Sequence, residues 1–242
     1  MTYVEGFICA VPKENREDYL RHAADAFPVF AEMGVRRHLE AWASDVPDGT
    51  TTDFRKAVQA KDGEDVVFAW FEHGSREERD AFNDKMMSDP RMEAMGASMP
   101  FDGKRMIFGG FAAMLDEGEG RGAYVDGFVA PVPSGNREAY LAMAQKATAK
   151  FREYGAVRVV EAWGDDVPDG RVTDFRRAVK AEQGENVVFS WIEWPDKATR
   201  DAAMARMQSD ERMMAEPMPF DGKRMFWGGF DIILDRPARE QG

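Results

Sequence analysis

The residues best suited to chemistry are glutamates and tryptophans that lie two positions apart within runs of β-forming residues. Glu40 precedes Trp42 in this way, and Trp70 precedes Glu72. Residues two apart on a strand share one face. A carboxylate on an otherwise apolar face loses water, which destabilises its charged form and can tune it as a general base. The same pattern recurs in the second half of the chain, at Glu161, Trp163, Trp191 and Glu193.

An arginine that follows a turn in each half is a further candidate. Arg55 and Arg176 each close a Thr-Asp-Phe-Arg motif. Arginine recognises carboxylates through paired hydrogen bonds, so either residue could hold an acidic ligand. An aspartate, Asp53 or Asp174, lies two residues before each arginine. Local pairing inside the motif is therefore the competing interpretation.

A structural role also competes for the glutamates and tryptophans. Tryptophans on strands commonly fill a core, and each glutamate could form a buried ion pair with a basic residue. The basic candidates are Arg37, Arg55 and Lys104, with Arg158, Arg176 and Lys223 in the second half. Both the ligand pocket and the buried pairs stay open at this stage.

The chain contains the same unit twice. Tyr3–Phe7 reads YVEGF and Tyr124–Phe128 reads YVDGF, while Glu40–Gly49 and Glu161–Gly170 read EAWASDVPDG and EAWGDDVPDG. The offset is 121 residues until just past Arg91 and then 119, because the second copy lacks two residues. A polar, glycine-rich connector separates the copies. We therefore expect two repeats, at residues 1–118 and 119–242.

Alignment of the copies removes several classes of site. In this alignment the three histidines, His22, His38 and His73, correspond to Met143, Val159 and Trp194, and Cys9 corresponds to Ala130. A symmetric metal site, Cys/His nucleophile or haem ligand is therefore not expected, although a site in one half stays open. Nucleotide-binding and acyl-enzyme motifs are also missing from the sequence. We expect no metal and no cofactor.

Each unit has the element order strand, helix, strand, strand, helix, strand. In the first unit we predict strands at 3–11, 35–43, 66–72 and 105–115, helices at 15–33 and from Ser75 to about Met87, and a further extended run at 54–60. This order is the split βαβ pattern of a ferredoxin-like unit, which leaves one sheet face uncovered. The fold class is therefore α+β, with two units packed sheet to sheet as a single-chain pseudo-dimer.

The eight residues MPFDGKRM occur at Met99–Met106 and again at Met218–Met225. The Asp-Gly pair inside the motif is typical of a tight turn. We expect Asp102 and Gly103 to form that turn and Lys104 and Arg105 to enter the last strand, with their side chains on opposite faces. Each repeat then supplies the same structural piece to one assembly.

Together these motifs resemble the YbaA-like family of small bacterial proteins of unknown function. The resemblance rests on YVxGFxxxVP, ExWxxDVPDGxxTDFR, VVFxWxE, SDxRM and MPFDGKRMxxGGF, in the same order in both halves. It implies a dimeric α/β-barrel, here with both units on one chain, and no established activity. Proteins of this fold include cofactor-independent monooxygenases, small-molecule isomerases, haem-handling enzymes and ligand-binding proteins, which is an analogy of fold alone.

Charge and composition limit the partners. The net charge is −12 with no basic run, which opposes nucleic acid and makes RNA binding the weakest reading. We expect no membrane partner, because no apolar run approaches the length of a span, and no signal peptide, because the N-terminus has no basic region. The single cysteine fits the reducing cytoplasm. The paired repeats allow the chain to be a monomer in solution.

Two functions remain. In the first, the chain binds a small organic molecule in a cavity between its repeats, which Glu40 and Glu161 line from equivalent positions. A glutamate could take a proton while an arginine or lysine stabilises the resulting anion. In the second, it is a non-catalytic binding or stress-related scaffold whose charges are all paired internally. The sequence leaves open whether the protein is an enzyme, and it leaves the ligand unnamed.

Overall fold

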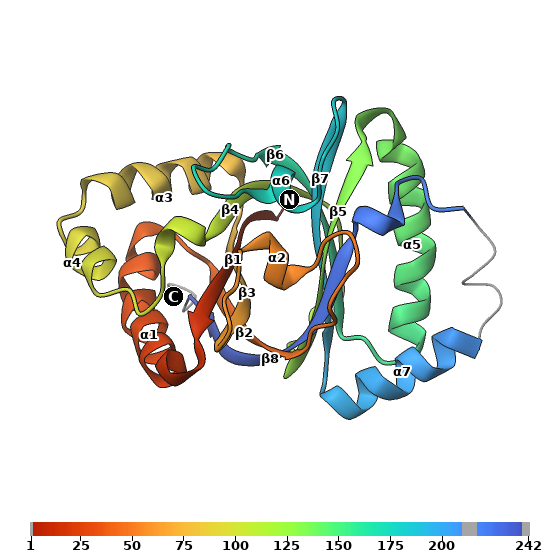
Figure 1. The fold of residues 1–242 in the computed structure, drawn as a ribbon, viewed down its shortest axis with the longest axis horizontal. Helices are drawn as coiled ribbons and strands as arrows, with labels where there is room; N and C mark the ends of the chain where they lie inside the picture. The colour runs from red at the N-terminus through yellow and green to blue at the C-terminus, as the bar shows by residue number, and fades with distance from the viewer. Residues whose placement is uncertain (1, 210–216, 239–242) are drawn as a thin grey trace.

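A computed structural model describes residues 2–209 and 217–238 (Figure 1). The first repeat contains β1 (Tyr3–Pro12), α1 (Arg16–Met33), β2 (Arg37–Asp45), α2 (Phe54–Ala57), β3 (Glu64–His73), α3 (Arg76–Ser88), α4 (Arg91–Ala97) and β4 (Ile107–Glu117). The second contains β5 (Tyr124–Pro133), α5 (Arg137–Glu153), β6 (Arg158–Asp166), α6 (Phe175–Ala178), β7 (Glu185–Trp194), α7 (Lys197–Ser209) and β8 (Phe226–Pro237). Apart from Ser209, the second SDxRM motif lies outside the described residues.

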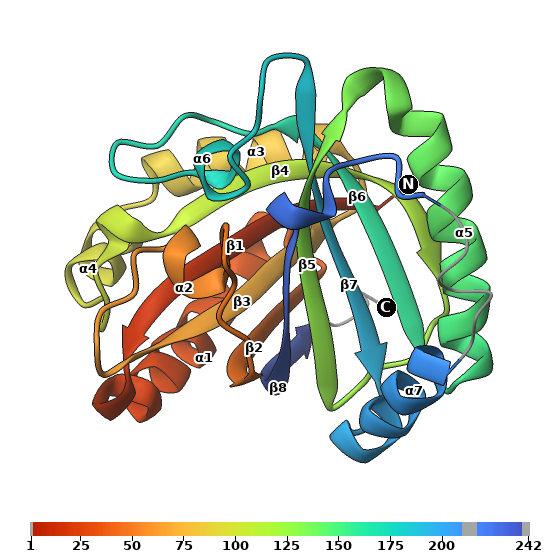
Figure 2. The same cartoon turned by 45° about the vertical axis from the view of Figure 1, so that its right-hand side comes forward.

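The eight strands close into one antiparallel barrel, which Figure 2 shows from the side. Their order around the barrel is β1, β3, β2, β8, β5, β7, β6, β4. Each repeat contributes four adjacent strands, and the repeats join where β2 pairs with β8 and β4 pairs with β6. The predicted α+β class and single-chain barrel are confirmed. The boundary between residues 118 and 119 stays a prediction.

The inside of the barrel is packed with aromatic rings. Phe68 and Phe189 stack with their ring centroids 4.6 Å apart, and Trp70 and Trp191 lie 4.2 Å apart. An eight-stranded barrel is just wide enough for side chains to fill it. The glycine of each YVxGF motif makes room for the stack, because a Cβ on Gly6 would lie 2.8 Å from a ring carbon of Phe189. The face that helices leave bare is thus covered by the other repeat.

The long helices lie outside the barrel, with α1, α3 and α4 on one side and α5 and α7 on the other (Figure 1). The ends of the helices in the first repeat follow their sequence signals. The side chain of Ser75 accepts a hydrogen bond from the Glu78 N–H at the start of α3, and α1 ends at Gly34, which has a left-handed φ of 118°. Within the described residues, no helix is long and apolar enough to cross a membrane.

The prediction of an extended run at 54–60 is wrong. Phe54–Ala57 forms the short helix α2, because the Asp53 side chain accepts a hydrogen bond from the Lys56 N–H and caps the turn. The helix directs Phe54 into the barrel, where its ring contacts Phe68 with centroids 5.7 Å apart. Thr52 also joins the repeats, since its hydroxyl donates to the Ala178 carbonyl at 2.6 Å.

The MPFDGKRM motif does form the expected turn, but Lys104 and Arg105 do not enter the last strand. Both lie in a 3-10 turn, Gly103–Arg105, that Asp102 caps by accepting from the Lys104 N–H. Arg105 is buried and donates two hydrogen bonds to Glu64, at 2.6 and 2.7 Å. The second copy is built the same way around Arg224. The motif therefore anchors the turn before β4 or β8 to the strand β3 or β7. Helix α4 was not predicted.

Candidate functional site

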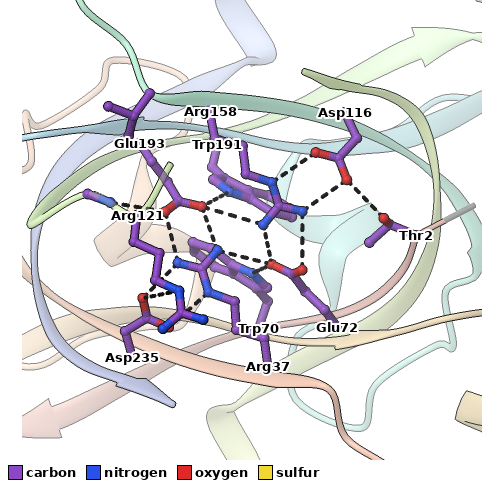
Figure 3. A network of polar contacts seen from close by, with 12 residues as sticks. Thr2, Arg37, Trp70, Glu72, Asp116, Arg121, Arg158, Trp191, Glu193 and Asp235 are labelled. Atoms are coloured by element: carbon purple, nitrogen blue, oxygen red, sulfur yellow. Dashed lines mark hydrogen bonds and ion pairs between the residues drawn. The ribbon is translucent and has the colours of Figure 1, made fainter. Parts of the chain in front are cut away.

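Six charged side chains meet at one end of the barrel (Figure 3). We call this group the barrel-end cluster; the first repeat supplies Arg37, Glu72 and Asp116, and the second supplies Arg158, Glu193 and Asp235. The members come from equivalent strands, β2, β3 and β4 in one repeat and β6, β7 and β8 in the other. Two of the predicted glutamates therefore lie in one cluster between the repeats.

Every arginine of the cluster reaches across to the other repeat. Arg37 donates to both carboxylate oxygens of Glu193, at 2.8 and 2.9 Å, and to both oxygens of Asp235, at 2.8 and 2.9 Å. Arg158 binds Glu72 at 2.7 and 3.1 Å and Asp116 at 2.8 and 2.9 Å. A fifth hydrogen bond joins Arg37 to Glu72 within the first repeat. The structural reading of Glu72 and Glu193 as buried ion pairs with Arg37 and Arg158 is confirmed.

The carboxylates hold the arginines charged. Burial alone would lower the pKa of Arg37, but its hydrogen bonds to Glu193 and Asp235 outweigh burial and raise the pKa above its usual value. For Asp116 burial has the opposite sign and would raise the pKa, because it destabilises the charged carboxylate. The hydrogen bonds from Arg158 outweigh burial and leave the pKa of Asp116 below its usual value. The charged forms of Arg37 and Asp116 are thus both stabilised within the cluster.

The predicted tryptophans Trp70 and Trp191 lie directly beside the cluster. Their ring nitrogens donate to Glu72 at 3.0 Å and to Glu193 at 3.2 Å, while their rings contact each other inside the barrel at a tilt of 31°. The Arg158 guanidinium also lies 5.8 Å from the Trp191 ring centroid. The rings therefore separate the charged cluster from the phenylalanine core.

A hollow of about 490 Å³ opens above the cluster, between the repeats. The buried Arg37 and Arg158 line it together with Glu72, while Arg36 and Arg121 contribute side chains that are 61% and 54% exposed. Arg36 donates to Glu78, and the Nε of Arg121 lies 4.0 Å from Asp235, beyond hydrogen-bond distance. Asp116 and Glu119 supply carboxylates to the same hollow.

The other two predicted glutamates lie elsewhere, on the outer face of the sheet. Glu40 accepts a hydrogen bond from Tyr19 of α1 at 2.6 Å, and Glu161 accepts one from Tyr140 of α5 at 2.7 Å. Each is therefore under the helix of its own repeat, and the expectation that both line one cavity between the repeats is wrong. The register explains the difference, because Leu39 is paired with Trp70 and Glu40 with Ala69, which turns Glu40 away from Trp70.

Glu161 has an unusual protonation equilibrium. Burial of its carboxyl raises its pKa to about 7, and this effect outweighs the hydrogen bonds from Tyr140 and Ser190, which lower the pKa. Such a carboxyl can gain or lose a proton near neutral pH. Among the predicted glutamates, Glu161 beneath α5 thus has the pKa best suited to proton transfer at neutral pH, and its role as a general base stays a prediction.

Trp42 and Trp163 also lie on the outer face. The guanidinium groups of Arg16 and Arg137 stand 5.5 and 5.7 Å from their ring centroids, in matching positions of the two repeats. Trp42 further donates to Asp65 at 3.0 Å. These tryptophans pack between strand and helix, apart from the barrel-end cluster.

Arg55 and Arg176 belong to neither group. Arg55 donates to the backbone carbonyls of Glu64 and Lys61, at 2.9 and 3.2 Å, and Arg176 donates to the Glu185 carbonyl at 3.3 Å. Local pairing with the preceding aspartates is also not seen, because Asp53 and Asp174 cap the short helices instead. A ligand role for these arginines stays a prediction.

Sequence reasoning missed four polar residues of these sites: Asp116, Asp235, Tyr19 and Tyr140. All four could have been found from the repeat. Asp116 and Asp235 each follow a leucine in the last strand of their unit, at the 119-residue offset, and the two tyrosines keep the 121-residue offset. Polar residues retained at equivalent positions within apolar stretches signal a shared contact.

A model of the family "Protein of unknown function (DUF1428)" matches residues 2–103 and 123–222. The uncharacterised protein YbaA of Escherichia coli (strain K12) is 59% identical over 117 residues, which is 48% of this chain and all of that protein. YbaA of Shigella flexneri gives the same values. These matches confirm the resemblance inferred from the motifs.

Solved structures of similar fold are more distant in sequence. An anthrone oxidase-like protein superposes with a TM-score of 0.59 at 14% identity, covering 100% of this chain and 94% of that one. A candidate monooxygenase from Fusobacterium nucleatum subsp. nucleatum gives a TM-score of 0.55 at 10% identity, covering 98% and 94%. At this level of identity the similarity establishes the barrel fold and nothing about activity.

Proposed function

This chain belongs to the DUF1428 family, whose function is unknown, and we propose that it binds a small acidic molecule in the hollow between its two repeats. The observation that carries the proposal is the hollow above the barrel-end cluster, with Arg36 and Arg121 exposed in its lining. A guanidinium group suits a carboxylate or phosphate because it can donate paired hydrogen bonds.

The buried Arg37 would form the floor of the hollow and would not bind the acid group of the ligand. The N–H groups of Arg37 already make five hydrogen bonds to protein carboxylates. The acid group of a ligand would therefore be held by Arg121 and by Arg36, the latter in exchange for its solvent-exposed bond to Glu78. Asp116 and Glu119 line the same hollow and can accept hydrogen bonds. The best-matched ligand is a small acid that also carries a hydroxyl or amino group.

A binding screen tests this proposal. Calorimetry and thermal-shift measurements on the full chain would use small hydroxy acids, amino acids and phosphorylated acids as probes. We expect at least one probe to bind, and we expect Arg36→Gln/Arg121→Gln to weaken its affinity tenfold or more. The matched control is Arg91→Gln/Arg171→Gln, which makes the same change in net charge at exposed arginines outside the hollow. Absence of binding by every probe, or equal loss in both variants, would contradict the proposal.

A purely structural scaffold is the second candidate. It is favoured by the fact that both arginines of the barrel-end cluster bind carboxylates of the opposite repeat. On this reading the cluster joins the repeats and the hollow above it stays without a ligand. The same screen separates the two candidates.

The remaining partner assignments are part of the proposal. A net charge of −12 supports a partner other than nucleic acid. Closure of the barrel within one chain supports a monomer. The free, buried Cys9 supports a cytoplasmic location. Light scattering and cell fractionation would test the last two assignments.

A further inference from the structure

The interface between α1 and the sheet of the first repeat gathers several titratable side chains that contact one another. Tyr19 donates to Glu40 at 2.6 Å, the His38 Nε2 lies 2.7 Å from the other Glu40 oxygen, and the Cys9 thiol lies 3.9 Å from the Tyr19 hydroxyl. His22 lies one turn beyond Tyr19 on the same helix. We call these five residues the α1 cluster.

The second repeat provides an internal control for this cluster. It keeps the tyrosine and the glutamate, as Tyr140 and Glu161 at 2.7 Å. Cys9, His22 and His38, however, are replaced by Ala130, Met143 and Val159. The same fold is therefore built without these three polar groups. Buried polar groups that folding does not require are candidates for function.

The α1 cluster also reaches the surface. His22 lines a hollow of about 390 Å³, and Arg21 and Asp25 line it with His22. Glu40 is close enough to His22 for its negative charge to raise the pKa of His22, although burial has the larger effect and leaves that pKa below its usual value. His22 is thus neutral at pH 7 and able to accept a proton, and Glu40 and Asp25 would stabilise the imidazolium.

We propose that this hollow is a second site, in which His22 acts as a general base on a small polar carbonyl compound. A C–H bond next to the carbonyl would break, its proton would move to a ring nitrogen of His22, and its electron pair would remain on the compound as an enolate. Arg21, which pairs with Asp18 at the same hollow, would stabilise the enolate oxygen. Return of the proton to another carbon or to the oxygen completes an isomerisation that needs no further reactant.

In this site Glu40 contributes its negative charge near His22. Its two oxygens are bound by Tyr19 and His38, which fix the carboxylate beneath α1. His38 is itself held in a ring of apolar contacts, with the Phe71 centroid 4.7 Å away. The charged groups around His22 are then Glu40 from β2 and Asp18, Arg21 and Asp25 from α1 itself.

Two measurements on the full chain test the proposal. The first is proton NMR of deuterium incorporation from D₂O into pyruvate, acetoacetate and dihydroxyacetone. We expect the chain to accelerate exchange in at least one probe and His22→Met to reduce this rate about 100-fold. Methionine is chosen because Met143 occupies this place in the second repeat, so the variant should fold. Met143→Leu is the control and should leave the exchange rate unchanged.

The second measurement does not depend on turnover. Three histidines give three resolvable ring signals, which single substitutions assign. Addition of the same probes should shift the His22 signal and leave that of the buried His73 in place. If no probe exchanges faster than in buffer, if His22→Met exchanges at the parent rate, or if the His22 signal does not move, the proposal is wrong.

Discussion

The two helix–sheet interfaces of this molecule share their framework and differ in their chemistry. Tyr19 and Tyr140 donate to Glu40 and Glu161 at 2.6 and 2.7 Å, and each tyrosine ring lies 5.6 Å from Phe101 or Phe220. Beyond this framework, Glu40 meets a histidine, whereas Glu161 meets Ser190. The Tyr–Glu hydrogen bond and the Tyr–Phe contact occur in both repeats, so we infer that the fold depends on them.

In the barrel-end cluster, by contrast, the two repeats supply the same residue types at equivalent positions. Its arginines have equivalent partners, yet their surroundings differ in burial. The Glu193 side chain that Arg37 binds has no exposed surface, whereas 12% of the Glu72 side chain that Arg158 binds is exposed. Equivalent residues of the two repeats can therefore contribute different amounts to the stability of the fold.

The largest expected effect follows from breaking this cluster. Arg37→Met should lower the free energy of unfolding by about 3–5 kcal/mol, because it leaves the buried Glu193 carboxylate without its main partner. Arg158→Met should cost less, since water can reach Glu72. Urea unfolding monitored by tryptophan fluorescence measures both. A loss below about 1 kcal/mol for Arg37→Met, or the reverse order of the two variants, would contradict this account of the cluster.

A smaller effect should distinguish the two outer glutamates. The pKa of Glu161 is raised to about 7 in the folded chain, against 4.5 without burial. The folded state then binds more protons than the unfolded state between these pH values, so stability falls as pH rises from 4.5 through 7. The total loss from this group is up to about 3 kcal/mol.

Glu161→Gln removes the charge and should be more stable than the parent at pH 8, with little difference at pH 4.5. Glu40→Gln is the matched variant. It should gain no stability at pH 8, because both Glu40 oxygens are engaged, by Tyr19 and by His38, and an amide nitrogen cannot replace the second acceptor oxygen. Melting temperatures of both variants across this pH range decide the matter. If the melting temperatures of the two variants changed with pH in the same way, the proposed difference between the two helix–sheet interfaces would be wrong.

The smallest effect concerns His73, which stands where the second repeat has Trp194. Trp194 donates to Asp126 at 2.8 Å, whereas among the described residues neither ring nitrogen of the buried His73 has a hydrogen-bond partner. Burial, together with the charge of Arg79, lowers the pKa of His73 to about 4. Stability from this group is complete above pH 6.5 and is lost as pH falls toward 4, by about 2 kcal/mol at pH 5.

His73→Phe should remove this acid-dependent loss, since phenylalanine has no group to protonate. Trp194→Phe should instead cost most at pH 7 and no more at pH 5, because the hydrogen bond that it removes stabilises the charged form of the buried Asp126 carboxyl. Denaturant unfolding at pH 5 and pH 7 compares the two. An unchanged pH dependence in His73→Phe would show that His73 does not cause it.

Much of the fold could be predicted because the sequence repeats. The duplicated motifs and the element order of each unit led to a barrel closed by two sheets, and the pairing of Glu72 and Glu193 with Arg37 and Arg158 was one of the stated alternatives. The orientation of Glu40 could not be predicted, because β2 is buried on both faces over Arg37–Trp42 and so lacks the alternation that reveals a strand's inner side.

Other parts were missed for local reasons. The sequence after Asp53 predicts an extended run at 54–60, whereas the aspartate caps a helical turn there. The hollow above the barrel-end cluster depends on Arg36 and Arg121, which come from segments far apart in the chain. No pattern of spacing within one strand or helix contains that information.

The barrel is closed by residues that both repeats share. The isolated first repeat tests this most directly. Residues 1–118 would expose the inner sheet face with Phe68 and Trp70, and would leave Arg37 without Glu193 and Asp235. In a dimer, Arg37 of each copy could bind Glu72 and Asp116 of the other, as the equivalent residues do in the full chain.

Light scattering on this fragment should therefore give twice the mass of one repeat, and the Arg37→Met fragment should lose the dimer. A fragment that stays monomeric and soluble, with the circular dichroism expected of the folded repeat, would contradict the claim.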